Sequence, residues 1–176
     1  MIDFSRNHFE LFGLPERFRF DPALLDRAYR ELQGAVHPDR HAAASAAAQR
    51  LALQSSARVN EAYRALKDPV ARAEYLLSLH GIDAFSETDT SLPLAFLERQ
   101  LERREAAAEA AATRDARALA ALLAGVNADS AELEQHVAGL FDAQGSWDLA
   151  RARVRELRFL QKLAVDIDAM LAELDS

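Results

Sequence analysis

The sequence predicts an all-α protein, and three observations support this fold class. Alanine accounts for 37 of the 176 residues, whereas there are only 6 glycines and 5 prolines. Alanine is the strongest helix former, and glycine and proline are the weakest. Apolar residues recur at spacings of three and four along most of the chain, which is the period of a helix. No stretch alternates apolar and polar residues as a strand does.

The first two helices are predicted from their capping signals. Asn7 can cap a short helix, which ends at the glycine and proline of residues 13–15. Asp21 is a good N-cap residue and is followed by proline at the first helical position. Apolar residues at spacings of four and three then mark one face of a helix over 22–36, namely Leu25, Tyr29, Leu32 and Val36. Pro38 stops this helix, because the residue before a proline is disfavoured in helical geometry.

Two further helices come before a linker. An alanine-rich helix is predicted over 42–67. Asp68 and the proline after it repeat the N-cap signal and begin a short helix. That helix ends at Gly81, which stands where a C-cap glycine belongs. Residues 82–93 are rich in Ser, Thr, Asp and Glu and contain a proline, so they predict a linker.

The remainder of the chain predicts a bundle of three helices. Apolar residues at helical spacing place these helices at roughly 94–111, 115–143 and 147–174. Gly125 and Asn127 are candidates for a break in the middle helix. Three helices joined by short turns pack as antiparallel neighbours.

Composition and charge exclude several classes of function. The chain has no cysteine, which rules out disulfides, thiolate nucleophiles and cysteine-ligated zinc or iron–sulfur clusters. Residues 1–80 carry 11 Lys/Arg and 10 Asp/Glu, a net +1, and residues 81–176 carry 10 and 18, a net −8. This asymmetry suggests two domains with different partners, and the acidic balance is unsuited to nucleic acid. No apolar run reaches the roughly 18 residues of a membrane span, and the N-terminus lacks the features of a secretory signal. We therefore expect a cytoplasmic protein with neither a membrane nor a nucleic-acid partner.

One cluster carries chemical information, the His-Pro-Asp-Arg-His run of residues 37–41. Common catalytic motifs are absent: there is no glycine-rich phosphate loop, G-x-S-x-G elbow or H-E-x-x-H pair. As a metal site the cluster offers two imidazoles and one carboxylate, with a cationic arginine among them. As an acid–base pair it lacks an obvious substrate pocket. The third interpretation is a turn in which proline ends one helix and aspartate caps the next, and the residues alone favour it.

The position of this cluster in the helix pattern resembles the J-domain of the DnaJ co-chaperones, in which a His-Pro-Asp tripeptide joins the second and third of four helices. Three further segments resemble HscB, the J-type co-chaperone of iron–sulfur cluster assembly, namely residues 9–15 (FELFGLP), 72–81 (RAEYLLSLHG) and 158–163 (RFLQKL). Their order and spacing fit this family over almost the whole chain. The resemblance implies a J-domain over 1–81, whose helical hairpin carries the His-Pro-Asp loop. It also implies a linker over 82–93 and a C-terminal three-helix scaffold-binding domain over 94–176.

The resemblance implies two protein partners and no catalysis by the chain itself. The J-domain engages a seventy-kilodalton heat-shock-type chaperone, HscA in this family, and stimulates its ATP hydrolysis. The residues that match this role are His37, Pro38, Asp39, Arg27, Arg30 and Arg40. The arginines form a cationic face that can steer toward an acidic surface on the chaperone. The alternative for them is an ordinary solvated helix face. We expect neither a cofactor nor a bound metal.

The second implied partner is IscU, the scaffold protein on which iron–sulfur clusters are built, which the C-terminal domain delivers to the chaperone. The residues that match this role are Leu97, Leu101, Glu102, Glu105, Glu109 and Phe159. The two leucines share a helical face along which two of the glutamates continue, a pattern that suits a small basic-faced protein. The alternative is that the leucines and the phenylalanine belong to the bundle core. Because carboxylates are rarely buried without partners, we expect both leucines to be at least partly exposed. Residues such as Leu94 and Ala108 would then fill the core-facing side.

Some features depart from the family pattern, and other functions stay open. Glu98 and Arg103 stand where the family often has apolar residues, which predicts a smaller apolar patch. A cysteine-rich extension and a transit peptide are both absent from the sequence, which favours a bacterial cytosolic protein over a mitochondrial precursor. One alternative is a J-domain co-chaperone with a different client bound by its C-terminal bundle. The other is a metal-dependent hydrolase that uses the histidines and aspartate of residues 37–41.

Overall fold

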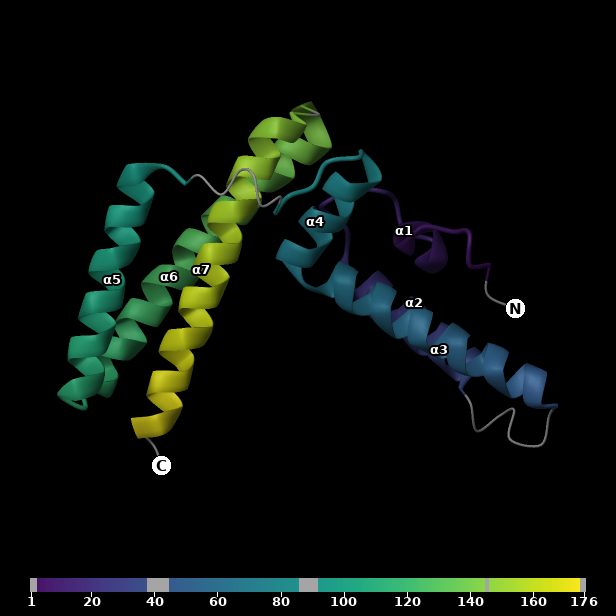
Figure 1. The fold of residues 1–176 in the computed structure, drawn as a ribbon, viewed down its shortest axis with the longest axis horizontal. Coiled ribbons are helices and arrows are strands. Elements are labelled where there is room, and N and C mark those ends of the chain that lie inside the picture. Colours follow the sequence, from purple (N-terminus) through teal and green to yellow (C-terminus); the bar gives the residue numbers. More distant parts are fainter. Residues whose placement is uncertain (1–2, 38–44, 86–91, 145, 175–176) are drawn as a thin grey trace. The chain divides into compact units, whose positions relative to one another are not determined.

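The computed structural model describes four stretches of the chain, residues 3–37, 45–85, 92–144 and 146–174. All the regular elements within these stretches are helices (Figure 1), so the all-α prediction is confirmed. The chain divides into two compact units, Met1–Leu79 and His80–Ser176. None of the described helices combines the length and the apolar character that crossing a membrane requires.

Four helices form the first unit in the predicted order, α1 (His8–Phe12), α2 (Pro22–Val36), α3 (Ala46–Lys67) and α4 (Pro69–Leu79). Helices α2 and α3 lie side by side as a hairpin (Figure 1). Helix α1 packs against both of them, and α4 packs against α3. The N-terminal region therefore has the helical hairpin that the sequence predicts.

Local capping hydrogen bonds explain where three of these helices begin. The Asn7 side chain accepts a hydrogen bond from the Glu10 amide (2.9 Å), and the Glu10 carboxylate accepts one from the Asn7 amide (2.8 Å). This reciprocal pair is a capping box, which satisfies two amides that the helix leaves unpaired. Asp21 and Asp68 likewise accept hydrogen bonds from amides in the first turns of α2 and α4, at 2.9 and 2.7 Å. The predicted N-caps are confirmed.

Helix α3 begins later than predicted. Ser45 has extended backbone geometry and caps the helix by accepting a hydrogen bond from the Ala48 amide, so the first helical residue is Ala46. The helix therefore does not run continuously from residue 42, and residues 42–44 lie outside the described part of the chain.

An apolar seam joins α2 to α3, and a polar ladder runs beside it. The buried side chains of the seam are Leu25, Val36, Ala52, Val59, Ala62 and Leu66. In the ladder, the Tyr29 hydroxyl and the Gln33 amide nitrogen both donate to the side-chain oxygen of Asn60, at 3.0 and 2.7 Å. The rings of Tyr29 and Tyr63 stack with centroids 4.0 Å apart. The ladder thus reaches Gln33, one turn before the end of α2.

The other end of the ladder is anchored on Asp26. Its carboxylate accepts hydrogen bonds from Lys67 (2.7 Å) and from the hydroxyl of Tyr63 (2.9 Å). The hydrogen bond from Lys67, and to a smaller extent that from Tyr63, lowers the pKa of Asp26 below its ordinary value. The hydrogen bond to Asp26 raises the pKa of Lys67. The hairpin is therefore fixed along most of α2, which sets the position of the residue that follows it, His37.

Arg72 ties the loop between α1 and α2 to the corner between α3 and α4. Its guanidinium carbon lies 4.6 Å from the ring centroid of Phe18 and 4.9 Å from that of Phe20. The same guanidinium donates a hydrogen bond to the carbonyl of Leu66 at the end of α3 (3.0 Å). A planar cation suits this position, because it can stack on aromatic rings and donate in its plane at the same time.

Three long helices form the second unit, α5 (Leu94–Ala112), α6 (Ala116–Gly139) and α7 (Trp147–Leu174). Each helix contacts the other two (Figure 1), so the predicted three-helix bundle is confirmed. The buried core contains leucine, isoleucine and valine from α6 and α7, whereas α5 contributes two alanines. These residues are Ala107, Ala110, Leu119, Val126, Leu160, Leu163 and Ile167.

Helix α6 differs from the prediction in two ways. It is not broken at Gly125 or Asn127, because Val126 between them is fully buried. Packing of this kind outweighs the cost of about 1 kcal/mol for a glycine within a helix. The α-helix also ends at Gly139, and a π-helical turn, Leu140–Gln144, takes the place of its predicted last residues. Leu140 and Phe141, the first two residues of this wider turn, are both buried.

The first residues of the second unit pack against α7. Ala84 is buried, and its carbonyl accepts a hydrogen bond from Nε of Arg155 (2.8 Å). The ring of His80 stacks on Trp147 with centroids 3.7 Å apart, and the guanidinium of Arg158 lies 4.0 Å from the Phe85 ring centroid. Residues 82–85 of the predicted linker therefore contact the bundle. The domain limits 1–81, 82–93 and 94–176 stay a prediction.

We predict that the stability of the first unit depends on pH through His8. Its ring is buried and stacks on Tyr75 with centroids 4.0 Å apart, and its Nδ1 has no hydrogen-bond partner. Burial lowers the pKa of His8, and the nearby charge of Arg58 lowers it further, while Glu61 opposes them. The unfolded chain takes up a proton as the pH falls through about 6.5, whereas the folded chain keeps His8 neutral. The free energy of unfolding should therefore decrease as the pH falls below that value.

The measurement is chemical denaturation at a series of pH values for the wild type and for His8→Phe, which preserves a stacked ring but does not titrate. The variant should lose less stability than the wild type between about pH 7 and pH 5. Parallel curves for the two proteins would contradict this role of His8.

Candidate functional site

The residues expected to engage a chaperone lie on α2 and just after it. His37 directly follows α2, is exposed, and has non-helical backbone angles (φ −58°, ψ 128°). Arg27 and Arg30 are exposed and three residues apart on α2, so they share a face of the helix. Arg30 also contributes to lowering the pKa of Asp26. The structure therefore positions three of the six predicted residues, and the other three, Pro38, Asp39 and Arg40, lie outside the described part of the chain.

The residues expected to bind the scaffold include two exposed leucines on α5. Leu97 is 38% exposed and Leu101 is 58% exposed, and Leu94 one turn earlier is 71% exposed. The prediction that both matched leucines are at least partly accessible is confirmed. Leucines exposed to this degree on one helix face form an apolar patch, because each lies three or four residues from the next. We call Leu94, Leu97 and Leu101 the leucine stripe.

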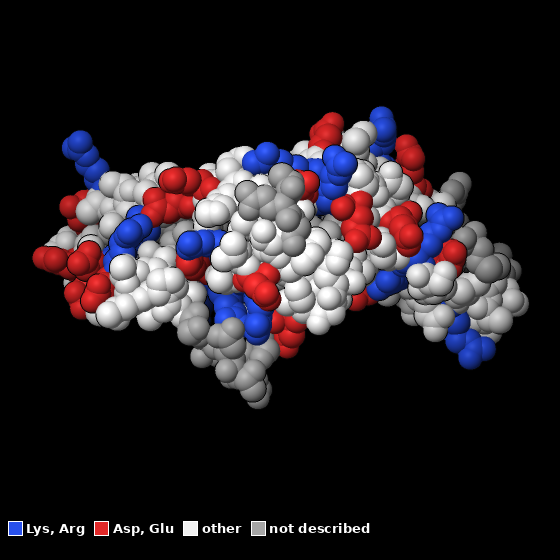
Figure 2. All heavy atoms as spheres, turned by 90° about the horizontal axis from the view of Figure 1, so that it is seen from above, with Lys and Arg blue, Asp and Glu red and all other residues white. Residues whose placement is uncertain are grey.

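An acidic stripe runs along α5 beside the leucine stripe. It consists of the exposed residues Glu98, Glu102, Glu105 and Glu109, which follow one another at intervals of three and four. At 100° per residue these glutamates lie next to the leucines on the helix surface and away from the core. Figure 2 shows exposed Asp and Glu side chains on the left of the view, the side on which the ends of α5, α6 and α7 lie in Figure 1. The predicted glutamates and leucines thus form two adjacent stripes on one accessible surface.

The core-facing side of α5 differs from the prediction. Leu94 and Ala108, expected to fill that side, are exposed instead. Gln100, Ala107 and Ala110 are buried there. The prediction was wrong because α5 has apolar residues on two sides, and only the packing of α6 and α7 decides which side is covered.

Arg103 belongs to the bundle interior and not to the leucine stripe. Its guanidinium donates to Asp129 on α6 (2.7 Å) and to the side-chain oxygen of Gln100 (3.2 Å), and its side chain is only 19% exposed. The expectation that Arg103 makes the exposed apolar patch smaller is therefore wrong. Glu98, the other residue that differs from the family pattern, lies in the acidic stripe.

Phe159 on α7 lies where α5 and α7 meet. Its ring is partly buried and packs edge-to-face on Phe96 of α5, with centroids 5.7 Å apart. The guanidinium of Arg104 lies 5.0 Å from the Phe159 ring centroid, and an Arg104 nitrogen lies 4.0 Å from a carboxylate oxygen of Asp166. Phe159 thus contacts α5 through Phe96 and Arg104, and it is not a fully buried core residue.

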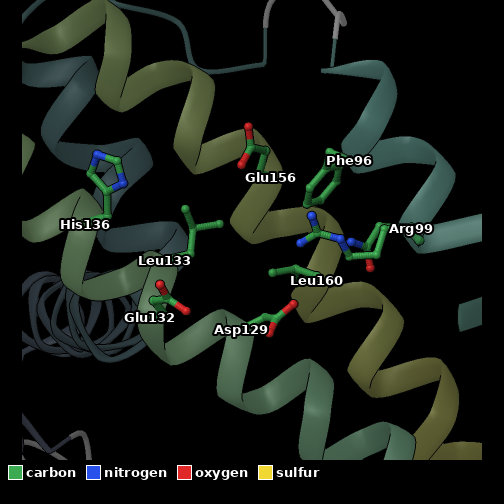
Figure 3. A pocket seen from close by; sticks show the side chains of 9 residues that line it. Phe96, Arg99, Asp129, Glu132, Leu133, His136, Glu156 and Leu160 are labelled. Carbon is green, nitrogen blue, oxygen red and sulfur yellow. The ribbon is translucent and has the colours of Figure 1, made fainter.

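A hollow lies between α5, α6 and α7 (Figure 3), with a volume of about 250 Å³. Its walls carry Asp129, Glu132 and His136 from α6 and the buried carboxylate of Glu156 from α7. The Glu156 carboxylate pairs with Arg153 at 2.7 Å, and that of Asp129 pairs with Arg103. Within the described residues no group of three or more His, Asp or Glu side chains is arranged to hold a metal ion. Sequence reasoning missed this hollow, although residues 129, 132 and 136 have the spacing of one helix face.

Comparisons with known proteins identify both parts of the chain. Residues 7–75 match the model of the DnaJ domain, and residues 92–168 match that of the HSCB C-terminal oligomerisation domain. The chain is 46% identical over 171 residues to the co-chaperone protein HscB homolog of Ralstonia nicotianae, covering 97% of each protein. It is 43% identical to that of Burkholderia multivorans over the full length of both.

Solved structures show the same fold. The chaperone HscB of Vibrio cholerae superposes with a TM-score of 0.85 at 38% identity, covering 96% of this chain and 99% of that one. Human co-chaperone HscB superposes with a TM-score of 0.88 at 30% identity, covering 96% of this chain and 83% of that one.

We predict that the leucine stripe contributes little to stability. The double variant Leu97→Ala plus Leu101→Ala removes side chains that already contact water, so the free energy of unfolding should fall by less than about 1 kcal/mol. The control is Leu163→Ala, because Leu163 is buried in the core. That single change should cost about 2–5 kcal/mol. Urea denaturation of the two proteins measures the difference, and an equal loss in both would show that the stripe is core.

Proposed function

The chain belongs to the HscB family of J-domain co-chaperones, and we propose that it brings an iron–sulfur scaffold protein of the IscU type to a seventy-kilodalton chaperone of the HscA type. In this proposal the first unit stimulates ATP hydrolysis by the chaperone, and the second unit holds the scaffold. The chain hydrolyses nothing itself and acts in the bacterial cytoplasm. The observation that carries the proposal is the leucine stripe, which lies exposed beside the acidic stripe on a helix of the second unit.

The physical case for scaffold docking rests on the chemistry of α5. Exposed leucines give a partner apolar area to bury, at about 25 cal/mol per Å². The four glutamates beside them carry negative charge without a core partner, and the second unit as a whole has a net −8, 10 Lys/Arg against 18 Asp/Glu over residues 81–176. Such a surface favours a partner with an apolar centre and basic surroundings.

The case for chaperone engagement rests on the end of α2. The polar ladder and the apolar seam hold α2 against α3 up to Gln33, and His37 follows four residues later at an exposed position. Arg27 and Arg30 give the same helix exposed positive charge, which can speed association with an acidic surface. A rigid helix end with a polar residue after it is suited to present that residue to a partner.

The alternative proposal is the same chaperone role with a different client on the second unit. The two proposals separate in one experiment, because both require stimulation of the chaperone ATPase but only the first requires binding of the scaffold. Stimulation without scaffold binding would favour the different client.

We predict that His37→Gln abolishes stimulation of the chaperone ATPase while the fold stays intact. His37 is exposed, and surface substitutions usually shift stability by within about 0.5 kcal/mol. The measurement is steady-state ATP hydrolysis by the chaperone with increasing amounts of each variant, together with far-UV circular dichroism. His136→Gln, the same change at an exposed position on α6, is the control and should stimulate as the wild type does. Full stimulation by His37→Gln would remove the tripeptide from the mechanism.

We also predict that Leu97→Ala plus Leu101→Ala weakens scaffold binding by about 2 kcal/mol or more, the loss typical of an interface hot spot. Isothermal titration with the scaffold protein provides the measurement. The matched control is Leu53→Ala plus Leu149→Ala, because these leucines are 62% and 61% exposed on other helices. The control should bind as the wild type does. Unchanged affinity in the α5 variant would overturn the proposed docking surface.

A further inference from the structure

A groove between α5 and α7 lies beyond the residues that the family resemblance assigns to scaffold binding. It has a volume of about 470 Å³ and is lined mainly by apolar side chains. Ala107 of α5 and Leu163 and Ile167 of α7 form its buried floor, and the partly exposed Met170 lines it as well. On the α5 side the groove is lined by the small side chain of Ala107 and by Arg104.

Arg104 joins this groove to Phe159. Its guanidinium lies over Phe159, 5.0 Å from the ring centroid, and the same side chain lines the groove and lies within 4.0 Å of Asp166. Arg104 therefore connects Phe159 to the groove along the seam between α5 and α7, and Leu101 lies one turn before Arg104 on α5. Along the axis of α5, Leu94 and Ala107 are about 20 Å apart at the helical rise of 1.5 Å per residue.

The charges around the groove are mostly negative. Asp166 and Glu173 of α7 both line it. The cation that lines it is Arg104, which lies beside Asp166. An apolar floor with an acidic surround is complementary to an apolar side chain on a basic-faced segment.

We propose that the groove between α5 and α7 is a second part of the docking surface and receives an apolar side chain from a basic-faced segment of the scaffold protein. This inference rests on the proposed function, since the occupant is the same scaffold that binds the leucine stripe. Its basis is the position of Arg104, which lines the groove and lies over Phe159, and the two carboxylates of Asp166 and Glu173 that line it. It adds Ala107, Ala169 and Met170 to the surface that the scaffold covers.

The test is Ala169→Arg, compared with Ala172→Arg on the same helix. Both alanines are exposed, but only Ala169 lines the groove. An arginine at 169 has Asp166 three residues before it and Glu173 four residues after it, so ion pairs on both sides hold it across the groove. Ala172→Arg adds the same charge to the same helix outside the groove. It therefore controls for general electrostatic repulsion of a basic partner.

Titration of the full-length variants with the scaffold protein should show affinity about tenfold weaker for Ala169→Arg and within about twofold of wild type for Ala172→Arg. A second blocking variant, Ala169→Trp, should also weaken binding about tenfold without a change of charge. Thermal melts of all three should match that of the wild type, and each should still stimulate the chaperone ATPase.

The possible failures are distinguishable. In the first case, Leu97→Ala plus Leu101→Ala weakens scaffold binding, but both Ala169 variants bind as the wild type does. The groove is then not part of the interface, and the proposed function stands. If the wild type itself does not bind the scaffold, the proposed function fails and this inference fails with it.

Discussion

The small and polar inward face of α5 is the constraint on which the C-terminal unit depends. Where α5 meets α6 and α7 its buried residues are Gln100, Ala107 and Ala110, and Phe96 is a larger, partly buried side chain packed against the core. The aliphatic bulk of the core comes instead from α6 and α7. Leu94, Leu97 and Leu101 of α5 lie on its other side and are exposed. Packing inside the bundle thus determines the chemistry of its surface.

The same constraint accounts for Arg103. A cationic side chain at a half-buried position is tolerated because Asp129 and Gln100 accept its hydrogen bonds, at 2.7 and 3.2 Å. The pair fixes α5 against α6 without needing a large apolar residue on α5. Arg104, one residue later, points along the seam with α7 and lies over Phe159. Two adjacent arginines therefore serve different purposes, one in the interior of the bundle and one at its surface.

Sequence reasoning succeeded where the physics is local. The caps at Asn7, Asp21 and Asp68 act within three residues, so the beginnings of three helices could be predicted, and apolar spacing predicted the hairpin and the bundle. It failed where a residue's surroundings come from far along the chain. Arg103 finds Asp129 26 residues away, and Arg72 reaches back to Phe18 and Phe20, neither of which periodicity can reveal. The orientation of α5 was half predictable for the same reason: the exposed leucines followed from the neighbouring glutamates, but the inward residues did not.

We propose that the scaffold protein docks on the outward side of α5 and leaves the J-domain hairpin free for the chaperone. The most direct measurement is methyl NMR of the leucine-labelled full-length chain, titrated with the unlabelled scaffold. We expect the signals of Leu94, Leu97 and Leu101 to shift strongly, whereas that of Leu25, which is buried in the first unit, should not shift. Shifts confined to leucines of the first unit, or unchanged signals from all three leucines of α5 at saturating scaffold, would contradict the proposal.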